Sequence, residues 1–540
     1  MSKNFNRPWH RFYSEGVSPS LDYPKKALPG MLEEISAQYG DVDAYIFYGK
    51  KTTYKEYNEQ VGRFATALSR LGVNKGDRVA IMAPNSPYYM ISYYAVLKLG
   101  AIVVQTNPMY TEREVSHQLK DSGAETMIVY DALFPTVAAA KPQSSLNNII
   151  VFSLGEEKTI EGEDVHRFDT LIVASPNDPP QVDINLAEDV AVLQYTGGTT
   201  GTAKGAMLTH QNILYNAHMI KCWDPDMQMA TDRGLAVLPL FHSYGMTCVM
   251  NAGVLLAATG ILVPRFEPQE ILKLIQGYKP TMFHGVPTMY AALLQQPNFK
   301  DFDTSSIRLC NSGGAALPIE VHKNFVNATG ASLFEGYGLS EASPVTHANP
   351  LDNNRVGTIG IPFPDTDCKV VDLATGEEVP VGERGELIIK GPQVMKGYWN
   401  MPEENAASLK DGWLYTGDIA IVDEDGYFSI VDRKKEMIIA GGYNIYPREV
   451  EEVLYECPGV VEAAVAGVPD QYRGETVWAF VVTKEGSNLT EQEIIKFCRD
   501  KMASYKAPRK VQFMGELPKT AVGKILRRKL SEQAKAVVEG

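Results

Sequence analysis

Residues 78–104, RVAIMAPNSPYYMISYYAVLKLGAIVV, contain two short apolar runs on either side of a stretch with helical character. The first run, residues 78–82, follows the turn sequence Asn74-Lys75-Gly76-Asp77. A helix is expected to begin after Pro87, and the second run, residues 101–104, is expected to be a buried strand. Strands that are separated by helices predict a parallel sheet with helices on its faces.

The same alternation continues along the chain to about residue 345. Thr111 and Glu114 form a capping box that opens another helix, and residues 126–129 predict a third strand. From residue 357 to residue 430 the pattern changes to short strands broken by Gly and Pro turns, which predicts a mostly antiparallel subdomain. The predicted fold is therefore α/β, with mixed, mainly parallel sheets flanked by helices and a β-rich subdomain.

A charged cluster at residues 432–436, DRKKE, predicts a domain boundary. Residues 433–540 carry 18 basic and 15 acidic side chains, whereas residues 1–432 carry 33 and 50. Beyond the cluster we expect a helix from Pro447, strands at residues 460–468 and 476–483, and a helix opened by the capping box Thr490/Glu493. The prediction is a large domain, 1–432, and a small α+β domain, 433–540, which suits contact with phosphates.

Composition excludes several classes of protein. The 540 residues carry a net charge of −14, which argues against a general nucleic-acid-binding protein. The six cysteines are scattered without a CxxC pair, which excludes a zinc framework and favours a reduced, cytoplasmic protein. The first 16 residues contain no apolar signal-peptide core. Residues 246–263 are the one candidate membrane span, but a buried helix over 246–258, a break at Gly260 and a strand over 261–263 explain them better.

The most informative motif is YTGGTTGTAKG, residues 195–205, which follows an apolar strand at residues 190–194 and precedes a helix from His210. Its glycines let backbone N–H groups approach an anion, its threonines add donors, and Lys204 adds positive charge. The pattern predicts a phosphate-binding loop, although the spacing differs from a Walker A loop. The alternative is a Gly/Thr-rich hairpin without a ligand.

This motif resembles the phosphate loop of the acyl-adenylate-forming enzymes, which include acyl-CoA synthetases, luciferases and adenylation domains. Further segments resemble the family's motifs in the same order, over nearly the whole chain. They are LPLFHSYG (238–245), GYGLSE (336–341), YTGD (415–418), DRKK (432–435) and PKTAVGK (518–524). EGYGLSEASPV (335–345), VMKGYW (394–399), DGWLYTGDIA (411–420) and VGKILRRKL (522–530) are similar to bacterial long-chain fatty-acid–CoA ligases.

The resemblance implies a reaction in two steps: a carboxylate attacks the α-phosphate of ATP and releases pyrophosphate, and the CoA thiol then attacks the acyl-adenylate. Both steps depend on positioning and on cations that stabilise developing negative charge. The catalytic residues that it implies are Lys524, Glu341, His242, Thr196 and Ser340, of which Glu341 and Thr196 would hold Mg²⁺. Ser340 stands where the family usually has Thr, and its hydroxyl is retained.

The resemblance also assigns the nucleotide site. Tyr337 would pack on adenine, with Gly314 and Ala315 on the other side, and Asp418 and Arg433 would bind the ribose. For Tyr337 taken alone, the less favoured alternative is a core residue. The full predicted ATP site is Thr196, Gly197, Gly198, Thr199, Thr200, Gly201, Lys204, Gly314, Ala315, Glu335, Gly336, Tyr337, Gly338, Ser340, Asp418, Arg433 and Lys524.

Lys524 lies in a basic run, residues 518–530, which without the resemblance would indicate a solvated surface. The family implies instead that Lys524 bridges the substrate carboxylate and the α-phosphate. It also implies that the small C-terminal domain is mobile and rotates about a hinge at Lys435 so that CoA can enter. The predicted CoA site is Gly441, Gly442, Tyr443, Arg473 and Lys506.

The acyl site is less clearly marked. His242 resembles the family's gate between the ATP and acyl sites, although an isolated histidine is more often a core residue. The predicted acyl pocket is His242, His284, Gly285, Val286, Gly336 and Gly338. The resemblance implies a medium- to long-chain fatty acid, and aryl acids such as coumarate or benzoate remain an alternative. Peripheral contact with the inner face of a membrane, and a monomer or homodimer, are compatible with the sequence.

Two functions from other classes fit the sequence less well. A serine hydrolase needs a nucleophile followed by an acid and a histidine, but the one histidine after Ser340 is His347, seven residues later, which leaves no room for the fold. A non-enzymatic acyl or nucleotide carrier would have no use for Lys524 beside a hinge. The expected ligands are thus a fatty acid, ATP, CoA and Mg²⁺, without nucleic acid or a transmembrane segment.

Overall fold

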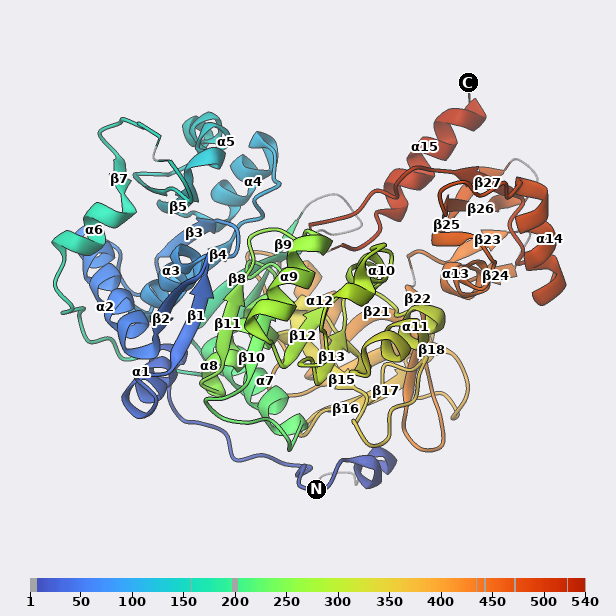
Figure 1. Ribbon diagram of the computed structural model, residues 1–540, viewed down its shortest axis with the longest axis horizontal. Helices are drawn as coiled ribbons and strands as arrows, with labels where there is room; N and C mark the ends of the chain where they lie inside the picture. Colours follow the sequence, from blue (N-terminus) through green and yellow to red (C-terminus); the bar gives the residue numbers. More distant parts are fainter. Residues whose placement is uncertain are drawn as a thin grey trace.

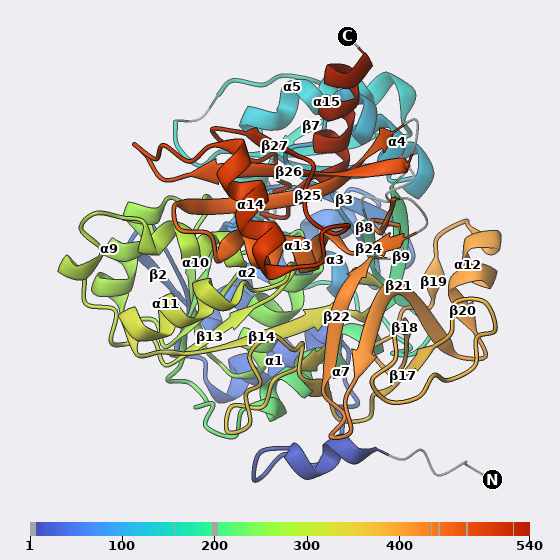
Figure 2. The same ribbon diagram turned by 90° about the vertical axis from the view of Figure 1, so that its right-hand side faces the viewer.

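The structure is a computed structural model that describes residues 7–156, 158–196, 203–433, 435–440, 443–470, 473–521 and 523–539. Two large sheets form the body of the molecule, and the C-terminal segment lies to one side of them (Figure 1). In the second view this segment lies across the sheets of the body (Figure 2). The mixed α/β fold with a β-rich subdomain and a small C-terminal part is as predicted.

The first large sheet contains the strands predicted from residues 78–104. Its eight strands lie in the order β19 (Gly397–Tyr398), β9 (Lys204–Thr209), β8 (Val190–Thr196), β4 (Ile102–Gln105), β3 (Arg78–Met82), β5 (Thr126–Tyr130), β6 (Asn148–Phe152) and β7 (Val165–Arg167). The six strands from β8 to β7 are parallel, whereas β9 and β19 add to the edge antiparallel.

The second large sheet is also mainly parallel. Its nine strands lie in the order β16 (Ile361–Pro362), β15 (Val345–Ala348), β14 (Ser332–Gly338), β13 (Leu309–Ser312), β12 (Met282–Gly285), β10 (Arg233–Ala236), β11 (Thr259–Leu262), β1 (Asp43–Phe47) and β2 (Lys50–Thr53). The six strands β14, β13, β12, β10, β11 and β1 are parallel to one another, whereas β15, β16 and β2 pair antiparallel at the edges.

Two smaller antiparallel sheets follow. The β-rich subdomain has the order β17 (Asp367–Val371), β18 (Gly385–Lys390), β21 (Trp413–Val422) and β20 (Leu409–Lys410), with β22 (Phe428–Arg433) on β21. The C-terminal sheet has the order β24 (Tyr443–Ile445), β23 (Ile438–Ala440), β26 (Gly474–Thr483) and β25 (Val460–Asp470). Its fifth strand, β27 (Lys510–Phe513), pairs with β26 in parallel. The predicted boundary after residue 432 falls at the end of β22.

The helices cover the sheets and fill the space between them. In chain order they are α1 (Leu28–Gln38), α2 (Tyr54–Arg70), α3 (Pro87–Lys98), α4 (Glu112–Ser122), α5 (Phe134–Ala140), α6 (Phe168–Ala174), α7 (His210–Trp223), α8 (Ala252–Leu255), α9 (Pro268–Tyr278), α10 (Pro287–Leu294), α11 (Ile319–Thr329), α12 (Pro402–Ser408), α13 (Pro447–Tyr455), α14 (Glu491–Lys501) and α15 (Arg527–Glu539). Within the described residues no helix is long and apolar enough to cross a membrane.

Strand β3 shows how one short run serves two cores. Val79 and Ile81 belong to the large core that lies between the two large sheets, whereas Ala80 and Met82 belong to a second core on the opposite face. Successive side chains of a strand point to opposite faces, so a strand that is covered on both faces is apolar throughout. This explains why residues 78–82 show no polar alternation.

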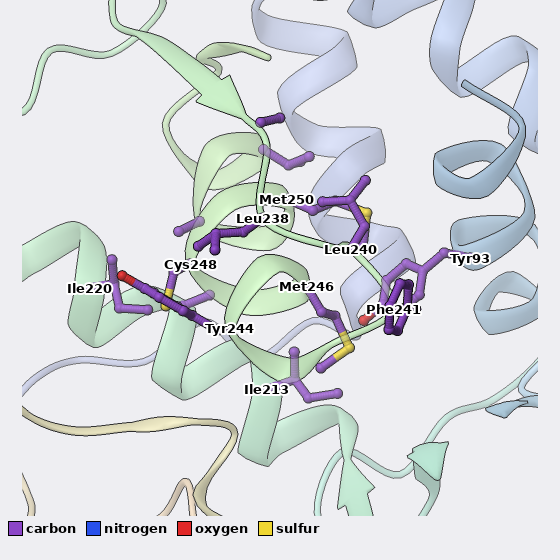
Figure 3. Close-up of a cluster of buried hydrophobic side chains, with 14 of the residues drawn as sticks. Tyr93, Ile213, Ile220, Leu238, Leu240, Phe241, Tyr244, Met246, Cys248 and Met250 are labelled. Atoms are coloured by element: carbon purple, nitrogen blue, oxygen red, sulfur yellow. The ribbon is translucent and has the colours of Figure 1, made fainter. Parts of the chain in front are cut away.

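The segment predicted as a helix over 246–258 is different in detail. It begins as a π-helix, Gly245–Asn251, and continues as the short helix α8. Gly260 is not the predicted break between helix and strand, because it lies inside β11 and pairs with Gly234 of β10. Figure 3 shows the buried side chains that surround the π-helix, with Tyr244, Cys248 and Ile220 close together. The segment is thus buried in the large core, as predicted.

Candidate active site

The predicted phosphate loop connects two paired strands. Thr196, the last residue of β8, pairs with Lys204, the first residue of β9. Strand β9 was not predicted, so the loop spans an antiparallel hairpin rather than leading directly into the helix at His210. Residues 197–202, which include Gly197, Gly198, Thr199, Thr200 and Gly201, lie outside the described residues. Lys204 forms an ion pair with Glu404, and its ammonium lies 5.1 Å from the centre of the Tyr398 ring.

The predicted metal ligand Glu341 follows directly on strand β14. It lies in a single 3₁₀ turn, Ser340–Ala342. The hydroxyl of Tyr398 donates a hydrogen bond to Oε1 of Glu341 at 2.7 Å. Beside it, the hydroxyls of Ser340 and Ser243 lie 3.1 Å apart. Tyr398 was not predicted as a site residue, although it lies in the motif VMKGYW.

Asp418, Tyr337 and Arg433 meet where strands β21 and β22 reach the end of β14. Asp418 and Arg433 are partners in the β21–β22 register, and Nε of Arg433 lies 3.3 Å from Oδ1 of Asp418. The Tyr337 hydroxyl donates to Oδ2 of Asp418 at 2.5 Å. Burial, followed by the charge of Asp418, raises the pKa of Tyr337 well above its usual value, so this hydroxyl stays a donor. The three predicted residues therefore form one polar cluster.

The neighbouring glycines are places of close backbone approach. A Cβ built on Gly338 would lie 2.1 Å from the carbonyl oxygen of Pro344, and one on Gly336 would lie 3.0 Å from Nδ2 of Asn311. Gly314 has φ +77°, and both it and Ala315 are exposed in the loop after β13. Larger residues would not fit at Gly336 and Gly338 without rearrangement.

Lys524 comes from the C-terminal segment and joins this cluster. Burial, reinforced by Arg433, lowers the pKa of Lys524 to about 8, while Glu436 and Asp418 act in the opposite direction. Its loop is closed by a hydrogen bond from the Thr520 backbone N–H to the Lys524 carbonyl at 2.8 Å. The predicted key cation of the C-terminal segment and the predicted ribose-binding residues thus lie within electrostatic range of each other.

Acidic residues that were not predicted hold the basic C-terminal run in place. Arg527 pairs with Glu436 at 2.5 Å and with Glu451 at 2.7 Å. Asp432 accepts backbone hydrogen bonds from Arg433 and Arg448, and burial raises its pKa to about 6. The basic run at residues 518–530 contains no acidic residue, and a buried cation needs a carboxylate as its partner. This was the signal in the sequence for acidic partners from elsewhere in the chain. The predicted hinge residue Lys435 is exposed.

Glu335 does not share the surroundings of the other predicted nucleotide-site residues. It is buried, and Nη2 of Arg448 on α13 lies 3.9 Å from its Oε1. Burial raises the pKa of Glu335 to about 7, although Arg448 lowers it. Its carboxylate therefore faces a helix of the C-terminal segment.

His242 lies on the loop that follows β10 of the second large sheet. Asn85, which follows β3 of the first large sheet, holds this loop in place. Nδ2 of Asn85 donates to the carbonyl oxygens of Ala236 at 2.9 Å and Leu238 at 2.8 Å, and its Oδ1 accepts from the Leu240 N–H at 2.8 Å. Burial, reinforced by Lys524, lowers the pKa of His242 to about 4, so the imidazole is neutral near pH 7. Lys524 is therefore close to the predicted gate as well.

Two apolar cavities meet at His284. Both are lined by His284, Cys248, Ile220 and Met227. The first extends between β10, β11 and the π-helix towards the following residues: Ala44, Tyr54, Tyr57, Met90, Gly234, Ala236, Gly253, Gly260, Leu262 and Met282. The second is lined by residues that include Asn311, Phe334, Val345 and Ala348. The other five residues of the predicted acyl pocket are described but do not line either cavity: His242, Gly285, Val286, Gly336 and Gly338.

The described residues of the predicted CoA site lie in the C-terminal segment. Tyr443 is 56% exposed and stacks on Tyr505 at 4.6 Å between ring centres. Lys506 forms an ion pair with Glu449 at 2.5 Å, and the Arg473 N–H donates to Asp470. Gly441 and Gly442 lie outside the described residues.

Comparison with known proteins identifies the family of this chain. Residues 32–399 match the family described as AMP-binding enzyme, and residues 449–524 match the AMP-binding enzyme C-terminal domain. The chain is 48% identical to a long-chain-fatty-acid–CoA ligase of Bacillus subtilis, over 98% of each chain.

Solved structures share the whole fold. The anthranilate CoA ligase AuaEII in complex with anthranoyl-AMP has a TM-score of 0.88 at 30% identity, over 96% of this chain and 98% of that chain. MatB from Rhodopseudomonas palustris, 31% identical, has a TM-score of 0.85 in its ATP-bound structure, which covers 95% of this chain and 100% of that chain. Its apo structure, which covers 96% of this chain and 100% of that chain, has a TM-score of 0.74. The chain belongs to the family of AMP-binding enzymes.

Proposed function

We propose that this chain is a fatty acyl-CoA synthetase that uses Mg·ATP and acts on medium- to long-chain fatty acids. In the first step the fatty-acid carboxylate attacks the α-phosphorus, a P–O bond to pyrophosphate breaks, and acyl-AMP forms. In the second step the CoA thiolate attacks the acyl carbonyl and AMP leaves as the acyl-CoA forms. The observation that carries the proposal is that the charge of Lys524 interacts with Asp418 and Arg433, the two residues that pair with each other beside Tyr337.

Lys524 is suited to the first step because it brings a positive charge to a buried site. Two anions, the carboxylate and the triphosphate, must approach each other, and a fixed cation lowers the energy of the transition state between them. Burial of the ammonium, which lowers its pKa to about 8, places it where the surrounding dielectric screens charge weakly. Asp418 would accept hydrogen bonds from the ribose hydroxyls, and Tyr337 already orients one of its oxygens.

The residues present fit a magnesium ion that is bound mainly through phosphate. Among the described residues there is no group of three or more His, Cys, Asp or Glu side chains that could hold a metal by itself. Mg²⁺ commonly uses one or two carboxylates, waters and substrate phosphates. Glu341 would supply the carboxylate and Thr196 a hydroxyl, and the ion would neutralise charge on the phosphates.

The second step requires that Lys524 give way to CoA, so we propose that residues 433–540 form a mobile domain that turns at Lys435. In support, the chain is more similar to ATP-bound MatB than to apo MatB, with TM-scores of 0.85 and 0.74. The arrangement described here would then be that of the first step. Gly441, Gly442, Tyr443, Arg473 and Lys506 remain the proposed CoA residues.

The cavities support an aliphatic acid. The first is lined almost entirely by apolar side chains and runs deep between β10, β11 and the π-helix, as a flexible acyl chain would require. An aryl acid is the second candidate, because AuaEII, a similar structure, is named an anthranilate CoA ligase. The enzyme would work in a reducing compartment, since all six cysteines are free thiols.

The test is pyrophosphate release with acids from acetate to palmitate, and with benzoate and coumarate, in the presence and absence of CoA. A maximum at long chains with CoA-dependent turnover supports the proposal. A maximum with an aromatic acid would support the same two-step mechanism with an aryl acid as the substrate. Absence of release with every acid would contradict the proposed reaction.

A further inference from the structure

Tyr398 makes a hydrogen bond that bears directly on the predicted metal ligand. Its hydroxyl donates to Oε1 of Glu341 at 2.7 Å, and the ring is 7% exposed. The backbone of Glu341 is also held by this segment, because its carbonyl oxygen accepts from the Met395 N–H at 2.8 Å. Residues 395–398 therefore hold Glu341 at both the carboxylate and the main chain.

The position of Tyr398 is fixed by the fold. Strand β19 pairs with β9, and Tyr398 lies opposite Ala206. The side chain of Asn405 accepts from the Tyr398 N–H at 2.5 Å and donates to the Tyr398 carbonyl oxygen at 3.0 Å. The next residue, Trp399, donates its N–H to the Gly205 carbonyl at 2.8 Å. Hydrogen bonds to Asn405 and β9 therefore fix the backbone that carries the Tyr398 hydroxyl.

The same tyrosine contacts the base of the predicted phosphate loop. The ammonium of Lys204 lies 5.1 Å from the centre of the Tyr398 ring, a distance typical of a cation–π contact. Lys204 also pairs with Glu404, the residue that precedes Asn405 on α12. One side chain therefore connects Lys204, at the end of the loop, with Glu341.

We propose that Tyr398 is a positioning residue for the metal-binding carboxylate of Glu341. By donating to Oε1 it fixes the rotation of the carboxylate and leaves Oε2 for the ion. A glutamate that is already oriented loses less conformational freedom when the metal binds. This inference rests on the proposed function, because it gives Glu341 the role assigned there.

The test is Tyr398→Phe, which removes the hydroxyl and keeps the ring beneath Lys204. Because the lost hydrogen bond is to a charged group, the Mg²⁺ concentration needed for half-maximal pyrophosphate release should rise about tenfold or more. The rate at saturating Mg²⁺ should return close to that of the wild type. By calorimetry, ATP with Mg²⁺ should bind more weakly, and ATP in EDTA should bind as to the wild type.

Tyr427→Phe is a matched control. Tyr427 is also buried, its hydroxyl donates to the Asn353 carbonyl at 2.7 Å, and the Arg355 guanidinium lies 3.8 Å from the ring centre. It should leave the Mg²⁺ dependence unchanged. The inference is overturned if Tyr398→Phe lowers the rate equally at all Mg²⁺ concentrations, if affinity for Mg·ATP is unchanged, or if both variants shift it equally.

The calorimetric measurement separates this inference from the proposed function. If the wild type releases no pyrophosphate with any acid, the proposed reaction fails, and Mg·ATP binding to Tyr398→Phe still decides the role of the hydroxyl. Binding in EDTA also reports whether the variant is folded, because it needs an intact nucleotide site without the ion.

Discussion

Gly523 packs directly against Val286, which brings the loop of the C-terminal segment onto the end of β12. A Cβ built on Gly523 would lie 2.9 Å from Cγ2 of Val286 and 2.9 Å from Oγ1 of Thr288. Gly523 also has φ +74°, a conformation that favours glycine. The residue before Lys524 therefore lies against Val286 and Thr288 with no room for a side chain.

Gly523→Ala should impair the first half-reaction selectively. The added methyl group must push the loop away from Val286, which moves Lys524, and the left-handed backbone adds about 1 kcal/mol of strain. We expect pyrophosphate release to fall at least about tenfold, by the cost of misplacing a catalytic group. Thioester formation from supplied acyl-AMP should be nearly unchanged. Gly486→Ala is the control, because Gly486 has φ +77° and nothing lies within 4 Å of its Cβ. Equal loss in both variants would contradict the proposed clash between the added methyl group and Val286.

Lys524→Ala should abolish acyl-AMP formation and leave thioester formation from preformed acyl-AMP largely intact. The reason is that the ammonium is needed where the carboxylate meets the α-phosphate and not where the thiol attacks. Rapid-quench assays of the two half-reactions measure this. Lys519→Ala is the control, since Lys519 lies in the same loop region but pairs with Glu462 at 2.7 Å. Equal loss of both half-reactions would contradict the proposal that the C-terminal domain turns between the two steps.

The first half-reaction should lose activity in alkaline solution. Lys524 acts as a cation, and burial lowers its pKa to about 8, so the charged form is present below this pH and is lost above it. The ratio kcat/KM for ATP reports the free enzyme and should fall as the pH rises through about 8. His242, with a pKa of about 4, stays neutral over this range and adds no second transition. A rate that is flat up to pH values near the usual lysine pKa of about 10.4 would count against the assignment.

Gly234→Leu should shorten the preferred fatty acid. Gly234 pairs with Gly260, both line the first cavity, and nothing lies within 4 Å of a Cβ built on Gly234. A leucine there would fill space that a long acyl chain needs, so kcat/KM for palmitate should fall about tenfold or more relative to octanoate. Retained activity with octanoate shows that the variant is folded.

Ala348→Leu, in the second cavity, is the comparison for this change. It should leave the ratio of palmitate to octanoate activity close to that of the wild type. A loss of palmitate activity in Ala348→Leu but not in Gly234→Leu would show that the acyl chain occupies the second cavity.

Asn85→Ala should destabilise the protein and slow the first step. The change removes three hydrogen bonds to the loop at residues 236–240 and leaves buried backbone groups without partners, a cost of about 2–4 kcal/mol. Denaturant unfolding measures the loss. Asn58→Ala is a control, because Oδ1 of Asn58 is buried without a hydrogen-bond partner among the described residues. A similar loss of stability in both variants would exclude a special role for the Asn85 contacts.

The local elements of the fold were predictable because their signals lie within a few residues. The run 78–82 became β3, and the capping boxes at Thr111 and Thr490 open α4 and α14, with Glu114 and Glu493 accepting the backbone N–H bonds of the two threonines. Lys524, Asp418 and Arg433 were identified by motif, and the structure brings them together. The approach of Lys524 to the other two residues could not be predicted, because it lies 91 positions after Arg433.

The sequence by itself determined the strand at residues 78–82, the two helices with capping boxes and the motifs, since these depend on side-chain periodicity and on hydrogen bonds between near neighbours. Only the tertiary structure decided that Gly260 continues a strand, because its partner Gly234 is supplied by β10. It also decided that Tyr398 contacts Glu341, 57 residues away, because β19 leaves its own subdomain to pair with β9. Such contacts arise from the packing of whole elements, and short-range patterns contain no information about which elements become neighbours.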